Sequence, residues 1–176
     1  RKTGRRKEAA YPGQRRLSGT SCAISTSGIR KCFDIVSEMK DAISRGGGEP
    51  DFDTPWHIRD EGIYSLEKGR TLYTSNAGLK ELKMEICSYL KRRFDVLYDY
   101  EKEVVVTVGG SEALDIALRA MLNPGDEVLV PQPSYVSYTP CTILAGGVPV
   151  VIELEEKDQF RLTKEKLLEK ITPKTK

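Results

Sequence analysis

The sequence predicts an α/β fold in which parallel strands alternate with helices that cover the sheet on both faces. Three observations predict it. Valine-rich apolar runs at 104–108, 127–130 and 148–154 have the length and composition of buried strands. Stretches with apolar residues at helical spacing follow them, at 111–122, 135–145 and 163–171. Glycine or proline turns separate these elements, and such alternation is typical of a parallel sheet.

Composition narrows the class of protein. The chain has 176 residues, 31% of them charged and 39% hydrophobic, which is typical of one globular domain or slightly more. A net charge of +2 is too small to indicate nucleic-acid binding, and no apolar run is long enough to cross a membrane. The cysteines lack metal-ligand spacing, so we expect no metal and free thiols in the reducing cytoplasm: Cys22, Cys32, Cys87 and Cys141.

The first 27 residues differ from the rest. They are rich in arginine, lysine, glycine and serine, with Glu8 as the single acid, which predicts a disordered basic tail. An organelle transit peptide is an alternative for such a segment, although no amphipathic apolar stripe accompanies the charge. Beyond it, apolar residues at helical spacing predict a helix over 29–43, which Ser27 can cap.

Two further helices are expected before the first strand. Thr54 is placed to cap a helix that has Pro55 at its first position and runs toward Gly69. A loop at 73–78 separates it from an amphipathic helix over 79–94.

The most informative stretch is VVVTVGGSEALDIALRAML at 104–122. Gly109 and Gly110 end the valine-rich run, and Ser111 can cap the helix that follows. A strand that turns through glycines into a helix directs unpaired backbone N–H groups at one point, where the helix dipole also favours negative charge. The sequence therefore predicts a phosphate-binding turn.

Four motifs in this order and spacing carry a family resemblance: GEPDFDTP at 48–55, YTSNAG at 73–78, VTVGGSEAL at 106–114 and PGDEVLVPQPSY at 124–135. Together they resemble the N-terminal half of class I/II aminotransferases, fold-type-I enzymes that depend on pyridoxal 5'-phosphate. The resemblance implies a three-layer αβα large domain, truncated here, whose N-terminal half is residues 51–176. Residues 28–50 would then form an N-terminal arm and small-domain segment.

The resemblance also implies site residues. Gly110, Ser111 and Glu112 match the loop that binds the cofactor phosphate, mainly through backbone N–H groups, with a further donor in the Ser111 hydroxyl. Tyr135 matches the aromatic residue that stacks on the pyridine ring. A plain helix cap and a core tyrosine are the simpler interpretations of Ser111 and Tyr135.

Two more residues match the family pattern. Tyr73 matches a tyrosine that reaches the cofactor phosphate of the partner subunit, which implies a homodimer of the complete protein. Gly48 matches a glycine whose backbone meets the substrate carboxylate. The implied reaction moves an amino group from an α-amino acid to a 2-oxo acid, with an aspartate- or aromatic-type donor.

The family's Schiff-base lysine has no counterpart that we identify. The lysines near the C-terminus have no fitting context and are typical of a solvated face: Lys157, Lys164, Lys166, Lys170, Lys174 and Lys176. No catalytic residue is therefore assigned, and we expect an N-terminal portion of an aminotransferase that is inactive by itself.

Three alternatives stay open. GGSEA resembles the nucleophile elbow of a serine hydrolase that would use Ser111, but the one histidine, His57, precedes it. A nicotinamide-binding domain would need a third spaced glycine, which is missing. A non-catalytic fragment or pseudoenzyme that binds the cofactor without turnover is the third.

Overall fold

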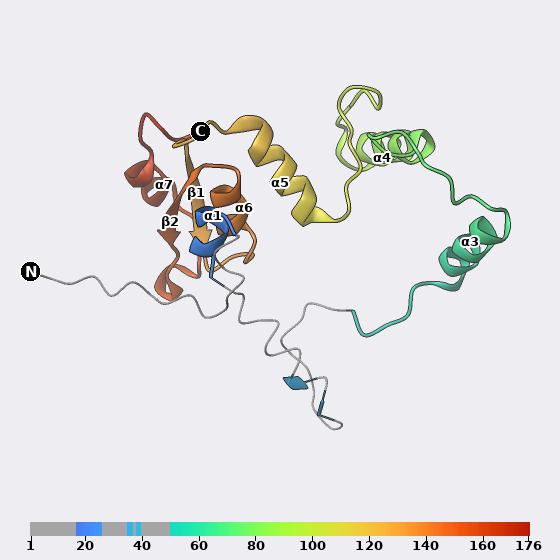
Figure 1. Ribbon diagram of the computed structural model, residues 1–176, viewed down its shortest axis with the longest axis horizontal. Helices are drawn as coiled ribbons and strands as arrows, with labels where there is room; N and C mark the ends of the chain where they lie inside the picture. The colour runs from blue at the N-terminus through green and yellow to red at the C-terminus, as the bar shows by residue number, and fades with distance from the viewer. Residues whose placement is uncertain (1–16, 26–34, 37, 40–49) are drawn as a thin grey trace, which may run out of the picture. The chain divides into compact units, whose positions relative to one another are not determined.

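The computed structural model describes residues 17–25, 35–36, 38–39 and 50–176 (Figure 1). Residues 17–25 and 110–176 belong to one compact unit, and the described residues from 35 to 109 belong to another. Gly48 and most of the predicted helix over 29–43 lie outside the described residues. Within the predicted tail, Gly19–Ala23 forms the short helix α1. Its N-cap is Ser18, whose hydroxyl accepts a hydrogen bond from the Ser21 amide.

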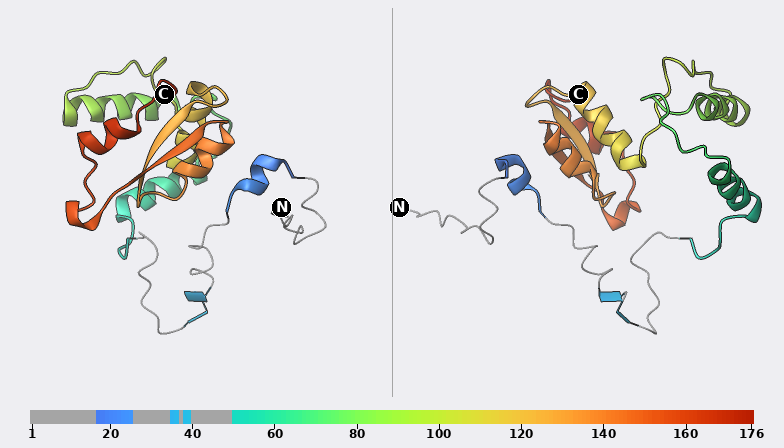
Figure 2. Two further views of the ribbon diagram at one scale, coloured as in Figure 1. Left: turned by 90° about the vertical axis from the view of Figure 1, so that its left-hand side faces the viewer. Right: turned by 45° about the vertical axis from the view of Figure 1, so that its right-hand side comes forward.

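The unit that contains residues 110–176 is organised around a two-stranded parallel sheet, β1 (Glu127–Gln132) and β2 (Val148–Glu153). The two strands pair along their full length, with Val130 opposite Val151. Helix α6 (Tyr138–Leu144) connects them, so the three elements form a β–α–β unit, whose strands lie side by side in Figure 2. This arrangement confirms the α/β class and two of the predicted strands.

A small core lies where these elements meet. Val130 of β1 and Ile152 of β2 are each only 2% exposed, and Thr142 of α6 is fully buried. The Thr142 hydroxyl donates to the Tyr138 carbonyl at 2.8 Å, so burial leaves this polar group with a partner. Because Val130 pairs with Val151 and Ile152 with Pro131, Val130 and Ile152 point to opposite faces of the sheet, and each face therefore has one almost fully buried side chain.

Helix α5 (Gly110–Met121) packs in the same unit, in contact with α6. Leu114 and Leu118 are one helical turn apart, so they lie on one face of α5. They line an apolar pocket together with Val130 and Tyr138. This is the amphipathic pattern that predicts the helix from the sequence.

Helix α7 (Lys164–Lys170) lies in contact with β2. The hydroxyl of its N-cap, Thr163, accepts a hydrogen bond from the Lys166 amide at 3.3 Å. The prediction of a helix over 163–171 is confirmed to within one residue at each end.

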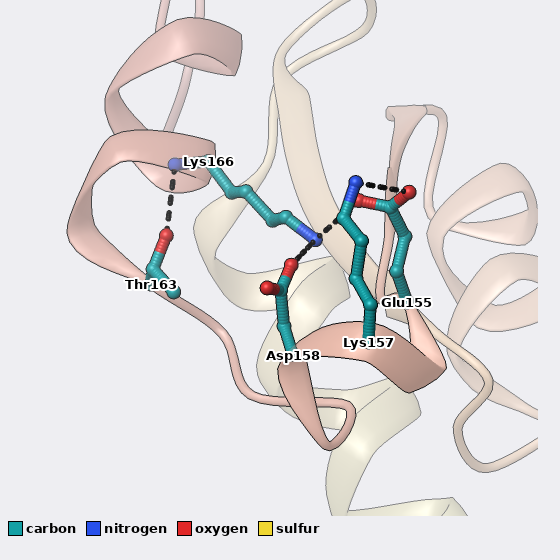
Figure 3. Close-up of polar contacts among 5 residues, drawn as sticks. All are labelled: Glu155, Lys157, Asp158, Thr163 and Lys166. Atoms are coloured by element: carbon teal, nitrogen blue, oxygen red, sulfur yellow. Dashed lines mark hydrogen bonds and ion pairs between the residues drawn. The ribbon is translucent and has the colours of Figure 1, made fainter.

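An ion cluster links α7 to the 3-10 turn η2 (Glu156–Asp158) (Figure 3). The Lys166 ammonium lies 3.1 Å from a Glu155 carboxylate oxygen and 2.9 Å from one of Asp158. Lys157 makes a further ion pair with Glu155 at 2.9 Å. Lys166 is therefore held between two acids and is not a freely mobile surface lysine.

In the other unit, helix α3 (Trp56–Glu67) begins one residue later than expected. The prediction that Thr54 caps a helix starting at Pro55 is wrong, because Pro55 itself is the N-cap and no side chain caps this end. The Pro55 carbonyl accepts hydrogen bonds from the amides of Ile58 and Arg59, at 3.0 and 3.2 Å. Proline has no backbone N–H, so none is left without an acceptor at this position, and the helix begins without a cap from the Thr54 side chain.

Helix α4 (Lys80–Phe94) matches the predicted helix over 79–94 and ends at Asp95, which has a left-handed conformation with φ of 57°. The predicted loop at 73–78 is also present.

The predicted strand over 104–108 is not formed within the described residues. Val105 and Val108 are 61% and 90% exposed, and the Val106 amide donates to the Ala77 carbonyl of a loop at 3.0 Å. A strand needs a neighbour that supplies a ladder of backbone bonds, and the sheet of the described residues contains only β1 and β2. β-branched composition alone therefore does not make this segment a strand.

Candidate functional site

The first turn of α5 presents backbone donors at an open position. The amides of Gly110 and Ser111 lie in its first turn, and the turn before it is made by Gly109, whose φ of 82° favours glycine. A Cβ placed on Gly110 would meet no described atom within 4 Å, other than its chain neighbours and its own helix backbone. The start of α5 is thus open at Gly110, although no strand leads into it.

Ser111 lies inside the helix rather than before it. The prediction that Ser111 is the N-cap is wrong, because α5 begins at Gly110. Before the helix, the Thr107 hydroxyl donates to the Gly109 carbonyl at 2.9 Å. The Ser111 side chain is consequently free of a capping role.

The Ser111 hydroxyl instead lies 2.6 Å from the Tyr135 hydroxyl. Tyr135 belongs to the segment between β1 and α6, and its ring packs edge to face on that of Tyr138, with centroids 5.7 Å apart. About half of Tyr135 is exposed. The structure thus brings together two residues that the sequence assigns separately, one to a phosphate and the other to an aromatic ring.

The hydroxyl pair changes the acidity of the phenol. The pKa of Tyr135 lies below its ordinary value of 10.0, mainly because the Ser111 hydroxyl stabilises the phenolate by hydrogen bonding, with a second contribution from Ser137. Burial and the nearby Cys141 act in the opposite direction and are weaker.

A pair of charges that sequence reasoning missed lies further along α5. The Arg119 guanidinium contacts the Asp115 carboxylate at 2.8 Å, which raises the pKa of Arg119. The second oxygen of Asp115 is buried without a hydrogen-bond partner among the described atoms. Burial, and then Asp115, raises the pKa of the Cys141 thiol. The sequence signal that could have revealed this ion pair is the four-residue spacing of Asp115 and Arg119 on one helix.

The remaining predicted residues belong to different parts of the chain. Tyr73 is fully exposed and belongs to the other unit, and Gly48 lies outside the described residues. Glu112 follows Ser111 in the first turn of α5, where its backbone N–H is among the leading amides. His57 lies on α3, in the other unit.

Among the described residues, no group of three or more histidine, cysteine or acidic side chains could hold a metal ion. The helices of that part of the chain are also too short or too polar to cross a membrane. The arrangement at the start of α5 suits another ligand class, an anion attached to an aromatic ring. Backbone donors and the Ser111 hydroxyl would meet the anion, and the half-exposed Tyr135, whose hydroxyl contacts that of Ser111, would offer its ring to the aromatic part.

Comparison with known proteins identifies the family. The model of aminotransferase class I and II matches residues 40–176. Aspartate aminotransferase of Pyrococcus abyssi is 46% identical over 153 residues, and YugH of Bacillus subtilis, provisionally named an aminotransferase, is 49% identical over 153 residues. These matches cover 87% of this chain and only 39% and 40% of those relatives.

Solved structures agree with the sequence comparison. Aspartate aminotransferase of Thermus thermophilus, solved with maleate, superposes with a TM-score of 0.83 at 35% identity, covering 91% of this chain and 43% of that one. The chain belongs to the aminotransferase class I and II family.

Proposed function

We propose that this chain supplies the cofactor-binding part of a pyridoxal 5'-phosphate-dependent aminotransferase, which transfers an amino group from an α-amino acid to a 2-oxo acid. The observation that carries the proposal is the meeting of Ser111 and Tyr135 at the open start of α5. Family membership supports it, since the named relatives are aminotransferases. The chain spans about 40% of those relatives, so the activity of the whole protein is part of the proposal.

The residues at this end of α5 fit the cofactor. The amides of Gly110, Ser111 and Glu112 and the Ser111 hydroxyl would hold the phosphate. The Tyr135 ring would lie against the pyridine ring and exclude water from that face. The Glu112 carboxylate would be repelled by phosphate, so only its backbone would take part. When bound, pyridoxal phosphate supplies an electron sink for carbanion chemistry at the substrate.

Two assignments complete the proposed site. Tyr73, fully exposed in its loop, would reach the cofactor phosphate of a partner subunit, which makes the working protein a homodimer. The Gly48 backbone would meet the substrate carboxylate. The free thiols of Cys22, Cys87 and Cys141 support a cytoplasmic location.

The lysines of α7 and its surroundings do not suit the role of the cofactor-bonding lysine. Such a lysine must be deprotonated to act as a nucleophile. Lys166 is paired with two acids, which raises its pKa, and Lys157 and Lys170 pair with Glu155 and Glu169. We therefore expect residues 1–176 to bind the cofactor without catalysing amino transfer.

Equilibrium dialysis with pyridoxamine 5'-phosphate tests the proposal. This ligand needs no lysine for binding, and unphosphorylated pyridoxamine is its matched control. We expect the phosphorylated ligand to bind at least about tenfold more tightly, since charge-assisted hydrogen bonds hold the phosphate. Equal affinities would reject the cofactor site.

A separate experiment tests whether Ser111 is the nucleophile of a serine hydrolase. Fluorophosphonate labels an activated serine nucleophile, and Ser111 has a tyrosine as its partner instead of a histidine. We expect no labelling of Ser111, and stoichiometric labelling at this residue would favour the hydrolase.

A further inference from the structure

The short contact between Ser111 and Tyr135 joins two hydroxyl groups that each have one hydrogen to donate. If Tyr135 donates to Ser111, the serine hydrogen is left for a third group. If Ser111 donates to Tyr135, that hydrogen is used, and the serine oxygen presents only lone pairs to its surroundings. The direction of this one bond therefore decides whether Ser111 can act as a donor.

We propose that the Tyr135 hydroxyl is a positioning group that donates to the Ser111 oxygen and thereby directs the serine hydrogen toward the cofactor phosphate. This inference rests on the proposed function. It gives Tyr135 a second role, because ring stacking needs no hydroxyl, whereas this role depends on the hydroxyl alone.

Two observations and one physical argument support this direction of the bond. Ser111 is the second residue of α5, so its side chain lies beside the leading amides that would meet the same anion. Ser111 does not cap the helix, and the hydrogen bond described for its hydroxyl is the one to Tyr135. A phosphate near Ser111 would repel serine lone pairs, and a chain of donors from tyrosine to serine to phosphate is cooperatively stabilised.

The neighbouring tyrosine provides a matched control. The ring of Tyr138 packs edge to face against that of Tyr135, and the hydrogen bonds described for Tyr138 involve only its backbone. Its replacement by phenylalanine removes a hydroxyl from the same aromatic pair without touching Ser111. An effect of general packing at this pair would appear in both Tyr135→Phe and Tyr138→Phe.

A double-mutant cycle on the 176-residue chain tests the inference, with dialysis against pyridoxamine 5'-phosphate and against pyridoxamine. Tyr135→Phe is expected to weaken binding of the phosphorylated ligand roughly fivefold, in the range of one hydrogen bond, and to leave pyridoxamine binding unchanged. In the Ser111→Ala background, Tyr135→Phe is expected to have no further effect, because the hydroxyl acts only through the serine.

Three results would overturn the inference and leave the cofactor site standing: an unchanged affinity in Tyr135→Phe, an equal loss for both ligands, or a further loss in the Ser111→Ala background. Equal binding of the two ligands by the unaltered chain would instead reject the cofactor site and the inference with it. Circular dichroism verifies that each variant folds. Tyr135→Trp, which keeps an aromatic ring without this hydroxyl, replaces Tyr135→Phe if the latter does not fold.

Discussion

The two units of the chain differ in how their apolar residues are used. In residues 110–176, the β–α–β unit buries Val130 and Ile152 almost completely. In the described residues from 50 to 109, no apolar side chain is buried, and Trp56 and Leu72 are 67% and 87% exposed. Paired strands with helices packed against them bury apolar side chains from nearby segments, whereas two helices joined by a loop do not. Ser111 and Tyr135 both belong to the unit with the core.

The largest expected effect is on stability. Ile152→Ala removes a side chain from the core and is expected to lower the free energy of unfolding by about 2–5 kcal/mol. Trp56→Ala on α3 is expected to cost less than about 1 kcal/mol, because the side chain is mostly exposed. Urea denaturation followed by circular dichroism measures both. Equal losses would remove the distinction between the two units.

The second effect is on ligand binding. Ser111→Ala is expected to weaken the binding of pyridoxamine 5'-phosphate roughly tenfold through the loss of a charge-assisted hydrogen bond. Ser65→Ala is the control in the other unit, since the Ser65 hydroxyl only donates to the Gly62 carbonyl of its own helix. Dialysis measures both affinities. An unchanged affinity in Ser111→Ala would remove Ser111 from the phosphate site.

The third effect is a pH dependence. The pKa of Tyr135 is lowered by Ser111 and then Ser137, so its phenol ionises below the ordinary value of 10.0. The phenolate accepts the serine hydrogen and places a negative charge beside the phosphate, so affinity for pyridoxamine 5'-phosphate falls as pH rises through this pKa. Tyr135→Phe is the control for other pH effects. It retains Cys141, the other titratable group near the phenol, and it is measured with the same ligand, so it lacks only the phenol.

The ratio of the affinities of the unaltered chain and Tyr135→Phe therefore isolates the phenol. We expect the ratio to fall on the alkaline side. A ratio that stays constant up to pH 10 would contradict the link between Tyr135 and the phosphate.

The smallest effect concerns the ion cluster of α7. Glu155 has a lowered pKa, mainly from Lys157 and then Lys166, so its stabilisation is present above the ordinary value of 4.5 and is lost as pH falls through the lowered value. Lys166 has a raised pKa, so its stabilisation is present below 10.5 and is lost as pH rises through the raised value. Lys166→Met is expected to lower the urea midpoint slightly at neutral pH, and less in high salt.

Lys164→Met is the control for this cluster, since Lys164 lies in the same helix and is not one of the cluster lysines. If Lys164→Met lowers the urea midpoint as much as Lys166→Met does, the loss of stability comes from the helix rather than from the ion pairs.

Much of the fold could be predicted because its signals are local. The strands β1 and β2 and the helices α4 and α7 follow from apolar periodicity and from turn or cap residues next to them in the chain. The segment at 104–108 was predicted wrongly because a strand depends on a partner elsewhere, which its own valines do not reveal. The start of α3 differs by one residue because Pro55 and Thr54 can each precede a helix.

The candidate site shows the same division. Gly109 before α5, Gly110 at its start and the phosphate-binding role expected of its first turn are readable from adjacent residues. The hydroxyl pair of Ser111 and Tyr135 is not, because 24 residues separate the two and their contact depends on how α5 and the β1–α6 segment pack. A sequence can nominate both residues, but only the packed structure joins them.

The central claim is that the start of α5 binds the cofactor phosphate. The most direct measurement is a titration of the 15N-labelled chain with pyridoxamine 5'-phosphate, followed by amide chemical shifts. We expect the largest shifts at Gly110, Ser111 and Glu112, and we expect unphosphorylated pyridoxamine not to produce them. Shifts confined to other places, such as the ion cluster around Lys166, would contradict the account.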